Sequence, residues 1–168
     1  KKNHTNDLVF INNKEKDSEI LKGDWIVKQP LIIEGDLTIN KGTRLRFSKN
    51  SYLIIKGGVK FYGEKDSPII LEGLDDSWKG LYILSKNNKS FIENVVIRNT
   101  SGVSDGILSL TGGVNIYKGN VYIENMLIQK STSEDALNIV NSKINVNNLR
   151  IESTRSDGFD CDYCYGSI

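Results

Sequence analysis

Two neighbouring stretches of the chain decide its fold: G-V-N-I-Y-K-G-N-V-Y-I-E-N-M-L-I at 113–128 and A-L-N-I-V-N-S-K-I-N-V-N-N-L-R-I at 136–151. When the two are aligned, apolar residues fall on apolar residues, and within each stretch single polar residues separate them. This alternation with a period of two indicates strands with one buried face. A third copy, G-F-D-C-D-Y-C-Y-G-S-I at 158–168, continues the series. The first column that the copies share is Val114, Leu137 and Phe159.

The repeat extends towards the N-terminus once loops of different length are allowed. Recurring apolar positions are Leu31, Leu53 and Leu81 in a first strand, Leu37 and Val59 in a second, and Leu45, Ile69 and Val95 in a third. Each strand is too short and too one-sided to be stable alone. Stacked about 4.8 Å apart around an apolar column, the strands predict an all-β fold, a parallel β-helix (solenoid) with three strands per coil and about five to six coils.

The corner between the second and third strands has the same chemistry in three repeats. It is occupied by Glu93-Asn94, Glu124-Asn125 and Asn147-Asn148. Asparagine tolerates the left-handed backbone of a tight corner, and its amide can bond the same amide one coil away. We therefore expect Asn94, Asn125 and Asn148 to form an asparagine ladder with a structural role.

The two ends depart from the repeat. Residues 1–24 lack it, which predicts an N-terminal cap or an added strand over the first coil. The β-helix is expected over residues 25–168. Because Ile168 aligns with the second strand of an unfinished coil, we expect further coils or a partner chain to cover the open backbone groups there.

Composition excludes several classes of function. The formal net charge is +1, so no basic surface favours nucleic acid. No apolar run approaches the roughly 20 residues of a membrane span. The one histidine, His4, lies in a polar N-terminal stretch, which removes most histidine-dependent catalysis. Cys161 falls in the apolar column and Cys164 at a corner, so we expect core packing rather than redox or metal chemistry.

Three further segments carry a family resemblance. They are G-D-L-T-I-N-K-G-T-R-L-R-F at 35–47, S-Y-L-I-I-K-G-G-V-K-F-Y-G-E-K-D-S-P-I-I-L at 51–71, and S-W-K-G-L-Y-I-L at 77–84. Over roughly residues 25–168 the chain resembles bacterial right-handed parallel β-helix repeat proteins of the pectate-lyase-like superfamily. The resemblance implies a right-handed helix in a secreted or cell-surface protein. Such relatives include polysaccharide lyases, hydrolases, epimerases, adhesins and stalks, so fold alone selects no activity.

Loop lengths predict where a site lies. The corner that leads from the third strand back to the first carries the long loops 75–80, 100–113, 130–135 and 153–157. Stacked loops of this kind form a wall, and the outer face of the first sheet becomes the floor of a groove. Because side chains alternate between the two faces of a strand, two rows should point outward onto that floor. The first row is Tyr82, Asn115, Asn138 and Asp160, and the second is Leu84, Tyr117, Val140 and Asp162.

The predicted groove becomes acidic towards the C-terminus. Asp135 and Asp157 lie at the loop edge, and Asp160 and Asp162 share a strand face about 6.6 Å apart. That spacing suits the acid and base of an inverting glycosidase, and oxygen ligands of this kind can hold Ca²⁺ against an acidic polysaccharide. The predicted catalytic residues are Asp157, Asp160, Asp162 and Arg155, with Asp160 and Asp162 as the predicted metal ligands. A solvated acidic edge is the alternative, because charged rows are usually surface.

Six residues of the groove are predicted to bind substrate. They are Trp78, Tyr82, Asn115, Tyr117, Asn138 and Asp135. An aromatic ring there could stack on a sugar, while Trp78 could equally cap the apolar column. The sequence also lacks the Gly-His-Gly motif of β-helix hydrolases and the Asp-Pro-His-Glu motif of the epimerases. Two hypotheses follow: a module that binds or modifies polysaccharide, and a structural stalk or adhesin segment.

Overall fold

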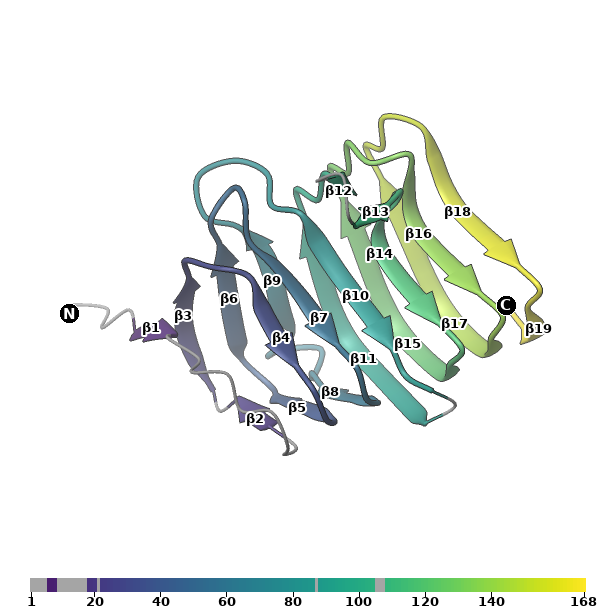
Figure 1. Ribbon diagram of the computed structural model, residues 1–168. Coiled ribbons are helices and arrows are strands. Elements are labelled where there is room, and N and C mark those ends of the chain that lie inside the picture. Colours follow the sequence, from purple (N-terminus) through teal and green to yellow (C-terminus); the bar gives the residue numbers. More distant parts are fainter. Residues whose placement is uncertain (1–5, 9–17, 21, 87, 105–107) are drawn as a thin grey trace.

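The computed structural model of the chain describes residues 6–8, 18–20, 22–86, 88–104 and 108–168. Within these ranges the protein is all-β, and its strands form an eleven-stranded, a six-stranded and a two-stranded sheet (Figure 1). No helix among the described residues is long and apolar enough to cross a membrane. Nearly all strand pairs are parallel; the small β12–β13 sheet is antiparallel.

The six-stranded sheet contains the first strand of each repeat. Its members are β4 (Leu31–Ile33), β7 (Tyr52–Ile55), β10 (Gly80–Leu84), β14 (Gly112–Tyr117), β16 (Asp135–Val140) and β18 (Asp157–Asp162). They pair in this order, all in parallel. The register joins Leu81 to Val114, Val114 to Leu137 and Leu137 to Phe159, which confirms the predicted column.

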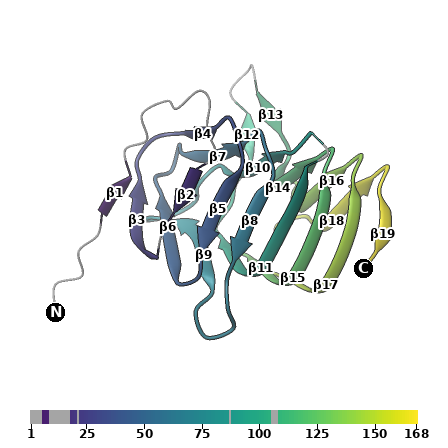
Figure 2. The same cartoon turned by 90° about the horizontal axis from the view of Figure 1, so that it is seen from below.

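The eleven-stranded sheet consists of two rows that merge. One row is β1 (Asn6–Leu8), β3 (Gly23–Val27), β6 (Thr43–Phe47) and β9 (Ile69–Gly73). The other is β2 (Ser18–Ile20), β5 (Leu37–Asn40) and β8 (Val59–Tyr62). Both rows continue in the long strands β11 (Lys89–Arg98), β15 (Asn120–Gln129) and β17 (Lys143–Glu152), with β19 (Tyr165–Ser167) beside β17. Figure 2 shows these strands side by side from below.

Each long strand spans both rows because an asparagine bends it. Asn94, Asn125 and Asn148 have φ values of 48°, 55° and 59°, in the left-handed region. The Asn125 Nδ2 group donates to Asn94 Oδ1 (3.3 Å), and Asn148 Nδ2 donates to Asn125 Oδ1 (2.6 Å). The predicted asparagine ladder is therefore confirmed.

The apolar core lies between the sheets and runs along the stack. Leu53, Leu81, Val114, Leu137 and Ile139 are fully buried in it. Towards the C-terminal end the packing thins, and the residues there are only partly buried: Leu149, Ile151, Phe159, Cys161 and Cys164. The stacked columns therefore supply most of the buried apolar surface.

One predicted register is wrong. Leu45 pairs with Leu71, not with Ile69, and Leu71 pairs with Ile97. The predicted alignment is displaced by two residues, which leaves every side chain on the correct face. Because strand periodicity is itself two, the sequence pattern cannot distinguish these registers, and the paths of the intervening loops decide between them.

The chain ends add strands to the stack. Of residues 1–24, which were predicted to form a cap or an added strand, the described parts are β1, β2 and the start of β3. β1 pairs in parallel with β3, and β2 with β5. The rest of the segment, His4 included, lies outside the described residues or between these strands. The division after residue 24 stays a prediction.

Substituting Ile139→Asp tests the inward assignment of the columns. Ile139 is fully buried in the core, so the change places an unpaired charge among apolar side chains and should lower the free energy of unfolding by about 3 kcal/mol or more. The matched control is Ile32→Asp, because Ile32 is exposed on β4 and the same change there should cost less than about 1 kcal/mol. Chemical denaturation of both variants measures the difference, and equal losses would contradict the assignment.

Two substitutions at Asn125 test the ladder. Asn125→Ala removes the amide bonds and puts at φ 55° a residue without the polar side chain that lets asparagine adopt the left-handed region, so it should lower the free energy of unfolding by about 2 kcal/mol. Asn125→Gly removes the same bonds but tolerates the backbone, and should cost about 1 kcal/mol less than Ala. Urea unfolding compares the two variants. If Gly were as damaging as Ala, the backbone requirement would not be supported.

Candidate functional site

The outer face of the six-stranded sheet carries the predicted site residues in the predicted rows. Tyr82 pairs with Asn115, Asn115 with Asn138 and Asn138 with Asp160. The next row joins Leu84, Tyr117, Val140 and Asp162. The face therefore changes along the stack from apolar and aromatic at β7 and β10, through amides at β14 and β16, to carboxylates at β18.

The middle of this face, over β7 and β10, is covered, which corrects the expectation of an open groove. The antiparallel strands β12 (Val103–Ser104) and β13 (Ser109–Leu110) belong to the loop 100–113. Val103, Leu108 and Leu110 pack with Tyr82 and Ile54 in a second apolar cluster. Tyr82 and Asn115 are consequently fully buried, and no ring surface of Tyr82 is left for a sugar.

The hydroxyl of Tyr82 is held inside the protein. It donates a hydrogen bond to the Lys79 carbonyl oxygen (2.6 Å). Burial, and after it repulsion from Tyr117, raises the pKa of Tyr82 well above its ordinary value. Tyr117 is only half-buried, and burial raises its pKa as well. Of the two tyrosines predicted to bind substrate, only Tyr117 keeps an exposed surface.

Trp78 is a core residue rather than a groove residue. Its ring stacks on Phe47 with 4.0 Å between the ring centroids and 10° between the planes. Its Nε1 group donates to the Arg98 carbonyl oxygen (2.8 Å), and the side chain is fully buried. Of its two predicted roles, the structure supports packing in the column, and substrate contact is excluded while the residue is buried.

The acidic end of the face is formed by β16 and β18. Asp135 pairs with Asp157 in the register, and Asp160 and Asp162 lie further along β18. Asp157 and Asp162 are exposed, Asp160 is half-buried and Asp135 is buried. Burial raises the pKa of Asp135, and repulsion from Asp160, Glu134, Asp157 and Asp162 raises it further. The predicted acids thus form one electrostatic cluster.

Arg155 lies beside this cluster on the loop between β17 and β18. Its backbone N–H donates to the Ser131 carbonyl oxygen (2.9 Å), while its side chain is exposed and forms no ion pair with any described residue. Nothing in these contacts directs the guanidinium towards the aspartates. Its role as a base therefore stays a prediction.

No three His, Cys, Asp or Glu side chains in the described part of the chain converge on a position that could hold a metal ion. Asp160 and Asp162 alone therefore do not form a complete metal site. Any cation at this end would need amide oxygens or water among its ligands.

The two cysteines form a disulfide, which was not predicted from the sequence. Their Cα atoms are 5.9 Å apart. Three residues along an extended strand would separate them by about 10 Å, but Tyr163, with φ 55°, turns the chain between them. Cys161 still packs against the core as predicted. The disulfide could not be predicted from the sequence pattern, because it depends on this turn.

A hollow beside the loop wall was not predicted as a distinct feature. It has a volume of about 280 Å³ and lies between the β12–β13 hairpin and the corner at 132–134. Its lining is rich in hydroxyl groups: Ser101, Ser104, Ser109, Thr111, Thr132 and Ser133, with Lys79 and Glu134. The length of loop 100–113 was the signal in the sequence, since that loop forms one wall.

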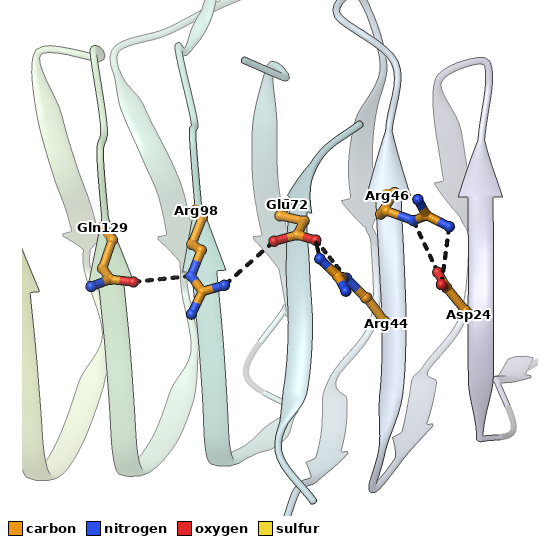
Figure 3. A network of polar contacts seen from close by, with 6 residues as sticks. All are labelled: Asp24, Arg44, Arg46, Glu72, Arg98 and Gln129. Atoms are coloured by element: carbon orange, nitrogen blue, oxygen red, sulfur yellow. Dashed lines mark hydrogen bonds and ion pairs between the residues drawn. The ribbon is translucent and has the colours of Figure 1, made fainter. Parts of the chain in front are cut away.

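The eleven-stranded sheet also carries a polar network that was not predicted from the sequence. Figure 3 shows side chains from adjacent strands in contact: Asp24, Arg44, Arg46, Glu72, Arg98 and Gln129. Arg46 holds Asp24 with two hydrogen bonds of 3.0 Å, and Glu72 lies between Arg44 and Arg98. Arg98 Nε donates to Gln129 Oε1 (2.9 Å). The three arginines and two acids leave a net charge of +1, but each charged side chain has an ion-pair partner, so the network offers no unpaired charge to a ligand.

Comparisons with known proteins give no assignment. No protein-family model matches the chain, and none of the curated proteins or solved structures compared with it matches either. The resemblance to β-helix proteins of the pectate-lyase-like superfamily therefore stays a prediction, and function has to be argued from the site.

Reduction of the disulfide should destabilise the C-terminal end. The bond closes a loop of only four residues, so chain entropy predicts a loss of about 2 kcal/mol in the free energy of unfolding. Denaturant unfolding with and without dithiothreitol measures the loss. The double variant Cys161→Ser/Cys164→Ser is the control and should unfold alike in both conditions. An unchanged midpoint for the native chain after complete reduction would contradict the expectation.

Proposed function

We propose that the chain is a right-handed parallel β-helix that binds polysaccharide as a module of a secreted or cell-surface bacterial protein. Three observations support the β-helix: parallel pairing between successive repeats, three rows of strands, and side-chain columns that continue through the core. The hand of the helix rests on the family resemblance and on the general right-handedness of parallel crossovers.

The observation that carries the binding proposal is the acidic end of the six-stranded sheet. Asp157, Asp160 and Asp162 present carboxylates from one strand, and Tyr117 keeps part of its ring exposed in the row of Asp162. Carboxylates accept hydrogen bonds from sugar hydroxyls, and a tyrosine ring supplies an apolar surface for a sugar face. The proposed binding surface is therefore β14, β16 and β18, because the hairpin covers the face over β10.

The proposal concerns binding and assigns no reaction. Catalysis by Asp157, Asp160, Asp162 and Arg155, and Ca²⁺ held by Asp160 and Asp162, stay predictions from the sequence. Asn138 and Asp135 are nearly buried, so we assign them to positioning rather than to direct contact with the glycan.

The disulfide supports the proposed location. Structural disulfides form and persist in oxidising surroundings such as the periplasm, the cell surface and the medium. Cys161 and Cys164 are bonded, and the described part of the chain has no free cysteine. This agrees with export of the protein.

A triple substitution tests the binding proposal. Asp157→Asn/Asp160→Asn/Asp162→Asn should weaken binding to neutral oligosaccharides at least about tenfold, since each Asn keeps the shape but loses charge-assisted hydrogen bonds. Glycan-array screening followed by calorimetry measures the affinity, and a thermal melt checks the fold. The control Asp66→Asn/Asp75→Asn/Asp76→Asn removes three exposed charges elsewhere and should bind as the native chain does. Equal affinity of both triple variants would contradict the proposal.

A structural stalk or adhesin segment is the second candidate. It is favoured by the self-paired outer surface of the eleven-stranded sheet, where the network around Glu72 and the asparagine ladder satisfy their own polar groups. Under this candidate the native chain would bind none of the oligosaccharides, and the aspartate variants would differ from it in neither melting temperature nor binding.

A further inference from the structure

A cleft lies on the eleven-stranded sheet, where the corners β2–β3, β5–β6 and β8–β9 meet. Its volume is about 540 Å³, within the range of small-molecule sites. The described residues that line it are Lys22, Asn40, Lys41, Tyr62 and Glu64. None of them belongs to the six-stranded sheet, so the cleft is separate from the surface proposed above for polysaccharide.

The cleft has an aromatic wall. Tyr62 is the last residue of β8 and is 42% exposed. The register pairs it with Asn40 at the end of β5, on a strand about 4.8 Å away. Lysine side chains also present methylene carbon along their stems, as Lys22 and Lys41 can do here. The cleft therefore offers a flat ring and further apolar surface to a ligand.

A glycine determines where Lys22 lies. Gly42 has a φ of 69°, in the left-handed region. A Cβ atom on Gly42 would lie 3.1 Å from Lys22 Cε and 3.5 Å from Lys22 Cδ, so the lysine stem crosses directly over the glycine backbone. Lys22 forms no ion pair with any residue that the structure describes. Its ammonium group is therefore a positive charge that no described acid balances.

An ion pair and backbone hydrogen bonds fix the loop at 63–68 beside the cleft. Lys41 Nζ lies 2.8 Å from Glu64 Oε1. The Gly42 N–H donates to the Ser67 carbonyl oxygen (2.9 Å), and Glu64 and Ser67 exchange two further backbone hydrogen bonds of 3.2 and 3.0 Å. The cleft is therefore formed before a ligand arrives. Its two lysines and one glutamate leave the lining with one positive charge.

We infer that this cleft binds a small aromatic carboxylate. The ammonium groups of Lys22 and Lys41 supply charge-assisted hydrogen bonds to the carboxylate, since the pair with Glu64 uses only one of the three donors of Lys41. The ring of the ligand packs on Tyr62. A small inorganic anion would leave that ring unused. A sugar acid fits less well, because its hydroxyl groups need several polar partners and Asn40 is the one side-chain amide among the described lining residues.

Nuclear magnetic resonance titration of the full chain with benzoate tests this inference. At constant ionic strength, benzoate should shift the backbone resonances of Lys22, Gly42 and Tyr62 saturably. Benzyl alcohol has the ring without the charge, and acetate has the charge without the ring. Each should bind at least about fivefold more weakly than benzoate. No glycan is present in this experiment, so its outcome is separate from that of the polysaccharide proposal.

Substitutions at exposed positions assign the two contacts. Lys22→Gln should weaken benzoate binding at least about fivefold, and Lys22→Arg, which keeps the charge, by less than about twofold. Tyr62→Leu should weaken it at least about threefold, and Tyr62→Phe, which keeps the ring, by less than about twofold. The matched control is Lys65→Gln, because Lys65 is exposed on the same loop but does not line the cleft. It should change the affinity by less than about twofold.

Several results would overturn the inference. Benzoate could cause no saturable shift at Lys22, Gly42 and Tyr62. Acetate or benzyl alcohol could bind as tightly as benzoate, which would remove the requirement for the ring or for the charge. Lys22→Gln could behave like Lys65→Gln, which would mean that benzoate responds only to the net charge of the protein. Glucuronate, titrated in parallel, could bind more tightly than benzoate, which would make a sugar acid the ligand instead.

Discussion

In-register parallel pairing between successive repeats is the constraint on which the rest of the structure depends. A strand such as β4, three residues long, cannot persist alone; it is held by the strand of the next repeat and by the column beneath it. Each pairing places like residues over like residues, so one short apolar pattern produces a core that runs the length of the stack. Loops between strands can then vary in length without disturbing the columns.

The same register determines the character of each outer surface. Where opposite charges meet on adjacent strands they form ion pairs, as Glu72 does with Arg44 and Arg98. Where amides meet at the corner they form a ladder. Where acids meet, as Asp135 and Asp157 do, neither can satisfy the other. When residues that attract each other recur at one position of the repeat, stacking produces a continuous ladder of contacts. When acids recur there, stacking produces a local excess of negative charge. That excess is the reason to locate function at β16 and β18.

The loop wall has an effect beyond that of forming a groove. The hairpin of β12 and β13 packs on Tyr82 and Ile54 and removes the aromatic part of the face from solvent. Exposed side chains of this face therefore lie towards its two ends, with Ile32 on β4 at one end and Asp157 and Asp162 on β18 at the other, and Tyr117 remains half-exposed. On the same face, the buried side-chain oxygens of Asn115 and Asn138 have no hydrogen-bond partner among the described residues.

The sequence by itself determined what is local: the alternation of apolar residues, the left-handed asparagine corners, and hence the outward rows that hold the predicted aspartates. These follow from backbone geometry and from a period of two, which each short segment carries. Tertiary structure decided the rest. The pairing of Leu45 with Leu71 differs from the predicted one by two residues. A pattern with a period of two cannot detect such a shift, because it leaves every side chain on the same face. The disulfide requires the turn at Tyr163, and the burial of Tyr82, Trp78 and Asn115 requires contacts with segments far away in the chain. Such contacts depend on the path of loops in space, because side-chain patterns specify which face a residue takes but not what will cover that face.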